Sequence, residues 1–326
     1  MTGRPSGLPG RAAALAALAL LAAGAAPPAA AAQATPAAAP AERPVATRAD
    51  TAALRRTLES LAAAHRGVVG YAVHNLDTGE RLERRGDETF PTASLIKVPI
   101  LVALFGLIEE GEMSLDDPLT VLKTDQVGGT GVLRLFRPGT LITVGDAARL
   151  MIAVSDNTAT NLLLDRVVIR RVWDKMEALG LPHTKVHSKS FKRNTSVAMD
   201  SSVKYGLGVT TSNEMARLFA LLADGKAVSA RADSTMLEIL EDADDPHMLQ
   251  RNVAARAAHK TGLTDQVRTE CTLWRLPARV VACVLTKENE DWRYAVDNAA
   301  QLTMARMGEA IVGAWRPPAA GTRPAP

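Results

Sequence analysis

The spacing of hydrophobic residues predicts a helix and then a hairpin at the start of the folded part of the chain. Leucines that are three and four residues apart lie on one face of a helix over residues 51–65. An apolar run over 68–75, the turn residues Asp77-Thr78-Gly79 and a second run over 81–84 follow it. This succession is typical of a β-hairpin.

The pattern turns almost entirely helical between Ser94 and about Leu240, and strands return after Asn252. The predicted helices are 94–110, 144–154, 158–168, 172–179 and 212–224, and the predicted strands are 254–260, 267–274 and 279–286, separated by Gly262 and Leu276-Pro277, before a last helix over 293–315. The hairpin and the late strands then complete one antiparallel sheet with the terminal helices on one face. We expect an α/β (α+β) fold with an α/β lobe at 49–90 plus 250–316 and an inserted helical lobe at 91–249.

Residues 1–34 predict a signal peptide of the Sec type. Arg4 and Arg11 precede the apolar run 12–26, and the small-residue site Ala32-Gln33-Ala34 follows. The run is shorter than the roughly 18 residues that span a membrane, and prolines end it. We therefore expect a secreted or periplasmic protein without a stable membrane anchor. Residues 35–48, rich in Ala and Pro, predict a linker, and 317–326 predict a disordered tail.

Charge and histidine spacing exclude several function classes. The formal net charge is +3, and removing residues 1–34 with their two arginines lowers it to +1, which gives no reason to expect a nucleic-acid partner. The six histidines form no H-x-H or H-E-x-x-H pair, so no metal site is predicted. No glycine-rich phosphate loop precedes a helix, so no cofactor is expected either.

Three short motifs occur in one order: Ser94-Leu95-Ile96-Lys97, Ser155-Asp156-Asn157 and Lys260-Thr261-Gly262. The S-x-x-K pattern alone is expected about once by chance in a chain of this length, and Ser201-Ser202-Val203-Lys204 is a second match. The first match opens an apolar helix directly after a loop, whereas the second lies in a polar segment. Context therefore favours Ser94 over Ser201 as the nucleophile.

Ser94 and Lys97 have the spacing of a nucleophile and its base. A serine hydroxyl needs a neighbouring base to take its proton, and Lys97 is one helical turn away. Burial against the apolar residues of the same helix lowers the pKa of a lysine toward that use. Because Ser94 begins the helix, its backbone N–H is free to hold a developing oxyanion.

The sequence around these motifs resembles the penicillin-recognising serine hydrolases, most closely the class A β-lactamases. The sharpest stretches are 137–140, 143–150 and 154–165, and the resemblance covers most of 50–315. It implies an enzyme in which Ser155 passes a proton to the leaving nitrogen, Asn157 holds a substrate amide and Asp156 braces the loop. It also implies that the N–H of Leu263 is the second oxyanion donor. We also expect a monomer. Residues 155–157 have a simpler interpretation as the cap of the following helix.

The third motif predicts a site for a substrate carboxylate. Lys260 and Thr261 have the chemistry to bind that group, and Gly262 permits close approach to the strand edge. Arg268 on the next strand is either a second carboxylate partner or an exposed strand arginine.

One departure from the family concerns deacylation. The resemblance implies a glutamate in the loop after the second motif, but no Asp or Glu occurs between Glu177 and Asp200. Three hypotheses stay open: a β-lactam hydrolase, a D,D-peptidase or esterase acting on D-Ala-D-Ala-like substrates, and a non-catalytic penicillin-binding module.

Cys271 and Cys283 are the only cysteines and fall on consecutive predicted strands. A three-residue turn at 276–278 places them opposite one another, where an oxidising compartment permits a disulfide. A two-residue turn leaves them out of register as free buried thiols.

Overall fold

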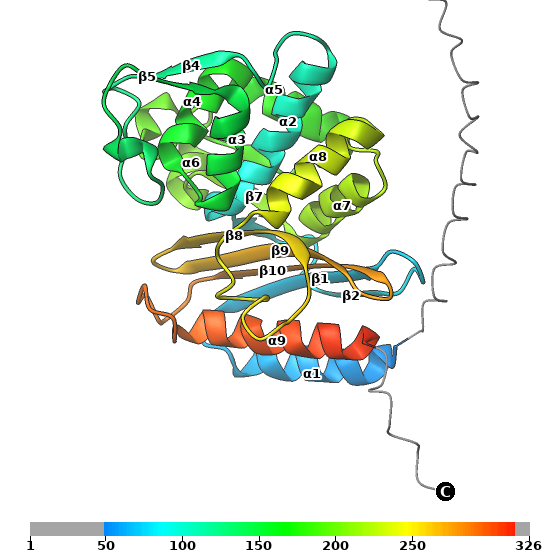
Figure 1. The fold of residues 1–326 in the computed structure, drawn as a ribbon. Helices are drawn as coiled ribbons and strands as arrows, with labels where there is room; N and C mark the ends of the chain where they lie inside the picture. Colours follow the sequence, from blue (N-terminus) through cyan, green and yellow to red (C-terminus); the bar gives the residue numbers. More distant parts are fainter. Residues whose placement is uncertain (1–48, 317–326) are drawn as a thin grey trace, which may run out of the picture. The chain divides into compact units, whose positions relative to one another are not determined.

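The computed structural model describes residues 49–316, so the predicted signal peptide, linker and tail lie outside the described residues. Its centre is an antiparallel sheet in the order β2-β1-β10-β9-β8 (Figure 1). These strands are β1 (Val68–Asn75), β2 (Arg81–Arg84), β8 (Ala257–Thr264), β9 (Val267–Arg275) and β10 (Arg279–Lys287). The first two come from the start of the chain and the last three from its end, as the sequence predicts.

Helices α1 (Thr51–Ala64) and α9 (Ala299–Trp315) cover one face of this sheet (Figure 1). Leu58 of α1 and Met307 of α9 are fully buried in one hydrophobic cluster with Tyr71 and Val73 of β1. Ala72, between those two strand residues, belongs to the cluster on the opposite face. The sheet is thus apolar on both faces, because both are covered.

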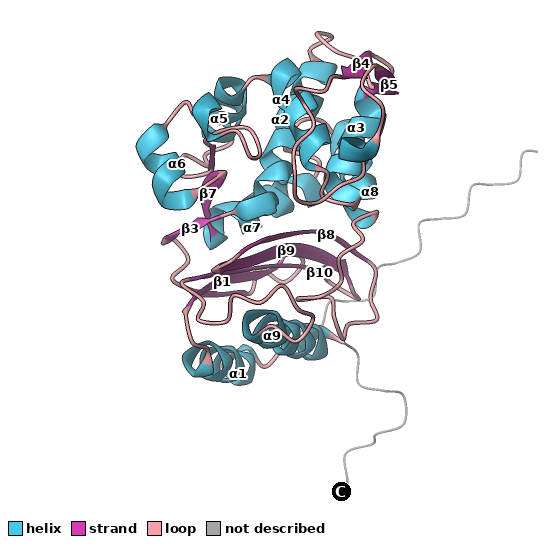
Figure 2. Ribbon diagram, turned by 90° about the vertical axis from the view of Figure 1, so that its left-hand side faces the viewer, coloured by secondary structure: helices cyan, strands magenta, loops and turns pink. Residues whose placement is uncertain are grey.

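The opposite face carries the helical block (Figure 2). Its elements are η1 (Ala93–Ile96), α2 (Lys97–Glu109), η2 (Leu133–Leu135), α3 (Val144–Ala153), α4 (Asn157–Val167), α5 (Ile169–Ala178), η3 (Arg193–Thr195), α6 (Met199–Tyr205), α7 (Ser212–Ala223) and α8 (Ala230–Glu241). Helix α2 is buried on every side from Lys97 to Leu107, so it forms the axis of the block. Side-chain caps at Thr143, Thr211 and Ser229 fix where α3, α7 and α8 begin.

Two small sheets within the block were not predicted. They are β3 (Thr89–Pro91), β7 (Gly208–Thr211) and β6 (Lys185–Val186), and β4 (Pro118–Val121) with β5 (Thr140–Thr143). Strands of two to four residues are too short to show an alternating pattern. The α/β (α+β) fold class is confirmed, whereas the lobe boundaries at 90/91 and 249/250 remain predictions.

The boundaries of three predicted elements are wrong, and for one of them, α5, the helix begins at Ile169 rather than at Val172. The last helix begins at Ala299 rather than near Arg293, because the Asn298 side chain accepts hydrogen bonds from the backbone N–H groups of Ala300 and Gln301 and starts the helix there. Strand β8 begins at Ala257 and continues through Gly262 to Thr264. Gly262 is therefore inside the strand, paired with Thr269, and does not end it.

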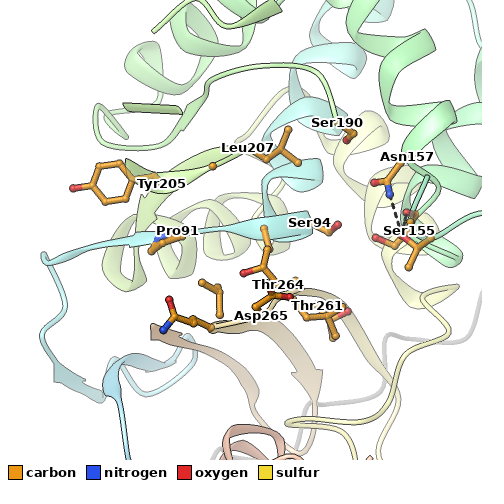
Figure 3. A pocket seen from close by; sticks show the side chains of 18 of the residues that line it. Pro91, Ser94, Ser155, Asn157, Ser190, Tyr205, Leu207, Thr261, Thr264 and Asp265 are labelled. Atoms are coloured by element: carbon orange, nitrogen blue, oxygen red, sulfur yellow. Dashed lines mark hydrogen bonds between the residues drawn. The ribbon is translucent and has the colours of Figure 1, made fainter. Parts of the chain in front are cut away.

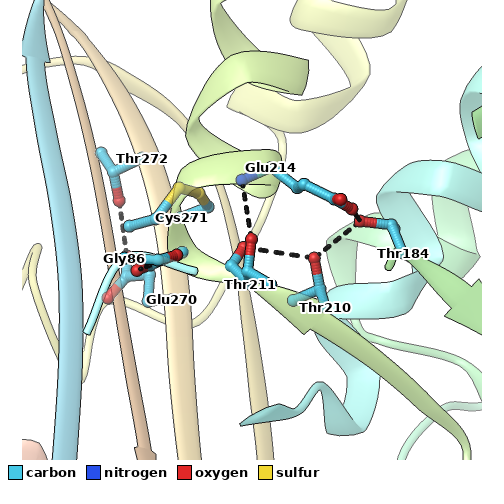
Figure 4. Close-up of a disulfide and its surroundings, with 10 residues drawn as sticks. Gly86, Thr184, Thr210, Thr211, Glu214, Glu270, Cys271 and Thr272 are labelled. Atoms are coloured by element: carbon cyan, nitrogen blue, oxygen red, sulfur yellow. Dashed lines mark hydrogen bonds between the residues drawn. A yellow bond between two sulfur atoms is a disulfide. The ribbon is translucent and has the colours of Figure 1, made fainter. Parts of the chain in front are cut away.

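Cys271 of β9 and Cys283 of β10 form a disulfide on the sheet face that meets the helical block (Figure 4). The strands are joined at residues 276–278, and the two cysteines are direct partners in the register. The pairing predicted for a three-residue turn is thus confirmed. Among the helices of residues 49–316, none combines the length and apolar character that crossing a membrane requires.

Candidate active site

A cleft of about 770 Å³ lies between the helical block and the edge strand β8. Ser94, Ser155 and Asn157 line it on the side of the helices, and residues 261–263 of β8 line it on the other (Figure 3). The three motifs, separated by up to 168 positions in the sequence, therefore meet around one cavity.

Ser94 is in the first turn of the helical segment that continues as α2. The segment starts with a 3₁₀ turn, and the preceding Ala93 has a left-handed backbone with φ of 47°. This conformation is unfavourable for a residue with a side chain, and such strain is concentrated at functional sites. It directs the chain so that Ser94 faces the cleft with its backbone N–H in a turn that lacks intrahelical acceptors.

Lys97 is fully buried and reaches across to the second motif. Its Nζ donates to the carbonyl oxygen of Ser155 (2.7 Å), to the Ser155 hydroxyl (3.1 Å) and to Oδ1 of Asn157 (3.0 Å). Burial lowers the pKa of Lys97 well below its usual range, and the positive charge of Lys260 lowers it further, against an opposing effect of Asp156. A lysine in this setting loses its proton more readily than an exposed one.

Asp156 braces the loop that carries Ser155. Its carboxylate accepts hydrogen bonds from the backbone N–H groups of Val132 (2.6 Å), Leu133 (2.8 Å) and Ala159 (2.9 Å). The last bond caps α4, so the interpretation of Asp156 as a helix cap is confirmed and is compatible with a structural role in the site. Ser155 has φ of 53°, a second left-handed residue beside the cleft.

Strand β8 forms the opposite wall. Lys260 is almost fully buried, and its Nζ donates to the carbonyl oxygen of Thr261 (2.9 Å). Burial lowers the pKa of Lys260 to about 8, although the carboxylates of Asp245 and Glu270 oppose this shift. Lys260 is therefore mostly protonated at neutral pH.

Gly262 permits close approach, but to the protein's own backbone. A Cβ at this position would lie 2.8 Å from the backbone nitrogen of Leu95 and 2.6 Å from Oγ1 of Thr269. Those contacts are far inside normal carbon–heteroatom separations, so only glycine lets β8 lie against the turn that carries Ser94. The spacing between Ser94 and Leu263 thus depends on Gly262.

Arg268 does not reach the cleft in this structure. Its guanidinium donates to the carbonyl oxygens of Thr264, Val267 and Arg293, and the ring of Tyr294 lies 5.4 Å from it. Neither alternative considered from the sequence describes it, because it is fully buried rather than exposed and both of its terminal nitrogens donate to backbone carbonyls rather than facing the cavity. It therefore supports the end of β8.

The loop between α5 and α6 contributes residues that sequence reasoning missed. Asn161 of α4 holds the backbone of Ser190, accepting from its N–H (2.8 Å) and donating to its carbonyl oxygen (3.1 Å). The Ser190 side chain lines the cleft, and among the described residues its hydroxyl has no hydrogen-bond partner. Phe191 follows with φ of 57° and a largely exposed ring. Asn161, four residues after Asn157 in α4, was the sequence feature that could have pointed to this loop.

Comparisons with known proteins agree with this geometry. The chain is 25% identical to beta-lactamase AER-1 of Aeromonas hydrophila over 217 residues, which cover 65% of this chain and 70% of that protein. It is 35% identical to a beta-lactamase of Rhodobacter capsulatus over 124 residues, covering 38% and 40% of the two chains.

Solved structures resemble it over a larger share of the chain. A beta-lactamase from Sphaerobacter thermophilus has a TM-score of 0.73 at 27% identity and covers 82% of this chain and all of its own. A variant of PBP-A, solved as an acyl-enzyme complex with penicillin G, has a TM-score of 0.71 at 25% identity and covers 83% and 98%. A family model described as the beta-lactamase enzyme family matches residues 53–315, and the chain therefore belongs to that family.

Proposed function

We propose that this protein is an exported serine hydrolase that forms an acyl-enzyme on Ser94 with β-lactams or related acyl compounds. The observation that carries this proposal is the buried Lys97, which is one turn from Ser94 and 3.1 Å from the Ser155 hydroxyl. A neutral lysine at this point connects the nucleophile to the group that would protonate the leaving nitrogen.

In the proposed acylation step, Lys97 takes the proton of the Ser94 hydroxyl as its oxygen attacks the acyl carbonyl. The backbone N–H groups of Ser94 and Leu263 hold the oxyanion that forms. The proton then passes from Lys97 to Ser155, and Ser155 delivers a proton to the leaving nitrogen as the C–N bond breaks. Asn157 is proposed to position the amide of the acyl group.

The rate of deacylation distinguishes a β-lactam hydrolase from a D,D-peptidase or esterase. The loop between α5 and α6 contributes Ser190, Phe191 and Arg193 to the lining of the cleft. None of these residues has a carboxylate that could activate the water needed for deacylation. This favours slow release of the acyl group, as expected of a D,D-peptidase or esterase that β-lactams trap. The similarity to PBP-A, a glutamate-bearing variant of which was solved as an acyl-enzyme with penicillin G, supports acylation by β-lactams and is neutral on the rate of release.

Export is proposed from residues 1–34, which lie outside the described residues. The mature chain should begin near residues 33–35, and N-terminal sequencing of protein recovered outside the cytoplasm tests this. We also propose that the enzyme acts as a monomer. The non-catalytic module is disfavoured because Ser94, Lys97, Ser155 and Lys260 are all present.

Mass spectrometry of the mature protein mixed with penicillin G tests the proposal. A mass increase of one penicillin that maps to the peptide containing Ser94, and that disappears in Ser94→Ala, is expected. An adduct that maps to Ser201, or no adduct at all, would contradict the mechanism. An adduct that persists for minutes after excess penicillin is removed identifies the slow-release enzyme, whereas rapid repeated turnover identifies an efficient β-lactamase.

A further inference from the structure

The hydroxyl of Thr261 is already occupied by a carboxylate of the protein. Thr261 Oγ1 donates to Oδ2 of Asp245 at 2.6 Å. Asp245 is in the segment between α8 and β8, and both residues line the cleft. A hydroxyl has one proton, so while this bond is made Thr261 cannot donate to a second acceptor in the cavity.

The buried cation beside Thr261, Lys260, faces two carboxylates, those of Asp245 and Glu270. Lys260 provides one positive charge, buried behind the strand with its Nζ directed to the carbonyl oxygen of Thr261. Asp245 provides a negative charge in the same wall, and Arg268 is bound to backbone carbonyls. A substrate carboxylate at this point would meet a cation already faced by two carboxylates, one of them in the cleft wall, and a hydroxyl whose proton is already donated.

We propose that Asp245 is a specificity-determining residue that disfavours substrates with a carboxylate on the leaving-group side and favours neutral ones, such as esters and amides. This inference rests on the proposed acylation of Ser94. A neutral leaving group suffers no repulsion from Asp245, and an amide N–H within it can donate to a lone pair of the Thr261 hydroxyl. A carboxylate must displace Asp245 from Thr261 before it gains that hydrogen bond.

Two probes that differ only in this charge test the proposal: penicillin G and its methyl ester. The second-order rate constant for acylation of Ser94 is measured by mass spectrometry for the wild type, Asp245→Asn and Asp244→Asn. Asp244→Asn is the matched control, because it changes an aspartate to asparagine in the same segment. Asp244 is exposed and does not line the cleft. Work at about pH 6 keeps Lys260, with a pKa of about 8, protonated.

We expect Asp245→Asn to raise the rate constant for penicillin G about 10- to 100-fold, the range for a hydrogen bond to a charged group, and to leave the methyl ester nearly unchanged. Asp244→Asn should change neither. If the ratio of the two rate constants is the same in Asp245→Asn and the wild type, the inference is overturned while the acyl-enzyme stands. If neither probe acylates the wild type, both fail. Asp245→Ala, checked by thermal unfolding, gives a second measurement should the amide variant fold poorly.

Discussion

Replacing Gly262 by alanine tests whether the contact between β8 and the Ser94 turn sets the geometry of the site. The new Cβ would lie 2.8 Å from the Leu95 nitrogen and 2.6 Å from Thr269 Oγ1, where a normal contact needs about 3.5 Å. Both neighbours are held in packed structure, so the strand and the turn must separate by roughly 1 Å. Ser94 precedes Leu95 and Leu263 follows residue 262, so the two proposed oxyanion donors move apart. A misplacement of about 1 Å can cost roughly 100-fold in rate.

The assay is the second-order rate constant for acylation by penicillin G, followed by mass spectrometry. Gly262→Ala should lower it about 100-fold while thermal unfolding shows a folded protein. Gly313→Ala in α9 is the control, because a Cβ there meets nothing within 4 Å and the rate should be unchanged. If folded Gly262→Ala acylates within about threefold of the wild type, the close approach does not position the nucleophile.

Three further predictions concern the base, the loop and the disulfide. Because burial lowers the pKa of Lys97, acylation should continue well below the pH at which an exposed lysine becomes neutral and should fall as acid protonates Lys97; a rate that rises only near about pH 10 would contradict this. Ser190→Glu should shorten the lifetime of the penicillin adduct about tenfold or more by placing a carboxylate on the loop that lines the cleft between α5 and α6, and an unchanged lifetime would show that Ser190 does not face the acyl carbonyl. The double variant Cys271→Ala/Cys283→Ala should lose about 3 kcal/mol of unfolding free energy in urea, and an unchanged midpoint would refute a role in stability.

The elements of the sheet and most helices could be predicted because each carries a periodic apolar pattern of its own. The hairpin at 68–84 and helix α1 are examples, with boundaries within one residue of those predicted. Boundaries fail where a tertiary contact decides them. The strand continues through Gly262 because the backbone beside Ser94 packs against it, and no local signal records that contact.

Some residues of the cleft could be predicted from local sequence motifs, and others are identified only by tertiary contacts. Ser94, Ser155 and Thr261 could be identified because each belongs to a short sequence motif. The structure brings the three residues to one cavity. Asp245 could not be recognised as a site residue, because it is one of several acidic residues in a polar segment. Only its hydrogen bond with Thr261 distinguishes it from them. The same reason explains Arg268, whose backbone partners become visible only when the strands are assembled.

The two buried lysines of the site differ in their counter-charges, and this difference assigns them different tasks. Lys97 has Asp156, whose carboxylate is also committed to three backbone N–H groups, whereas Lys260 has both Asp245 and Glu270. Lys260 therefore keeps its proton up to a pH of about 8, and its charge in turn favours the neutral form of Lys97. Asp245 thus has two proposed effects on this wall of the cleft: it opposes an incoming carboxylate directly, and it helps Lys260 keep its proton.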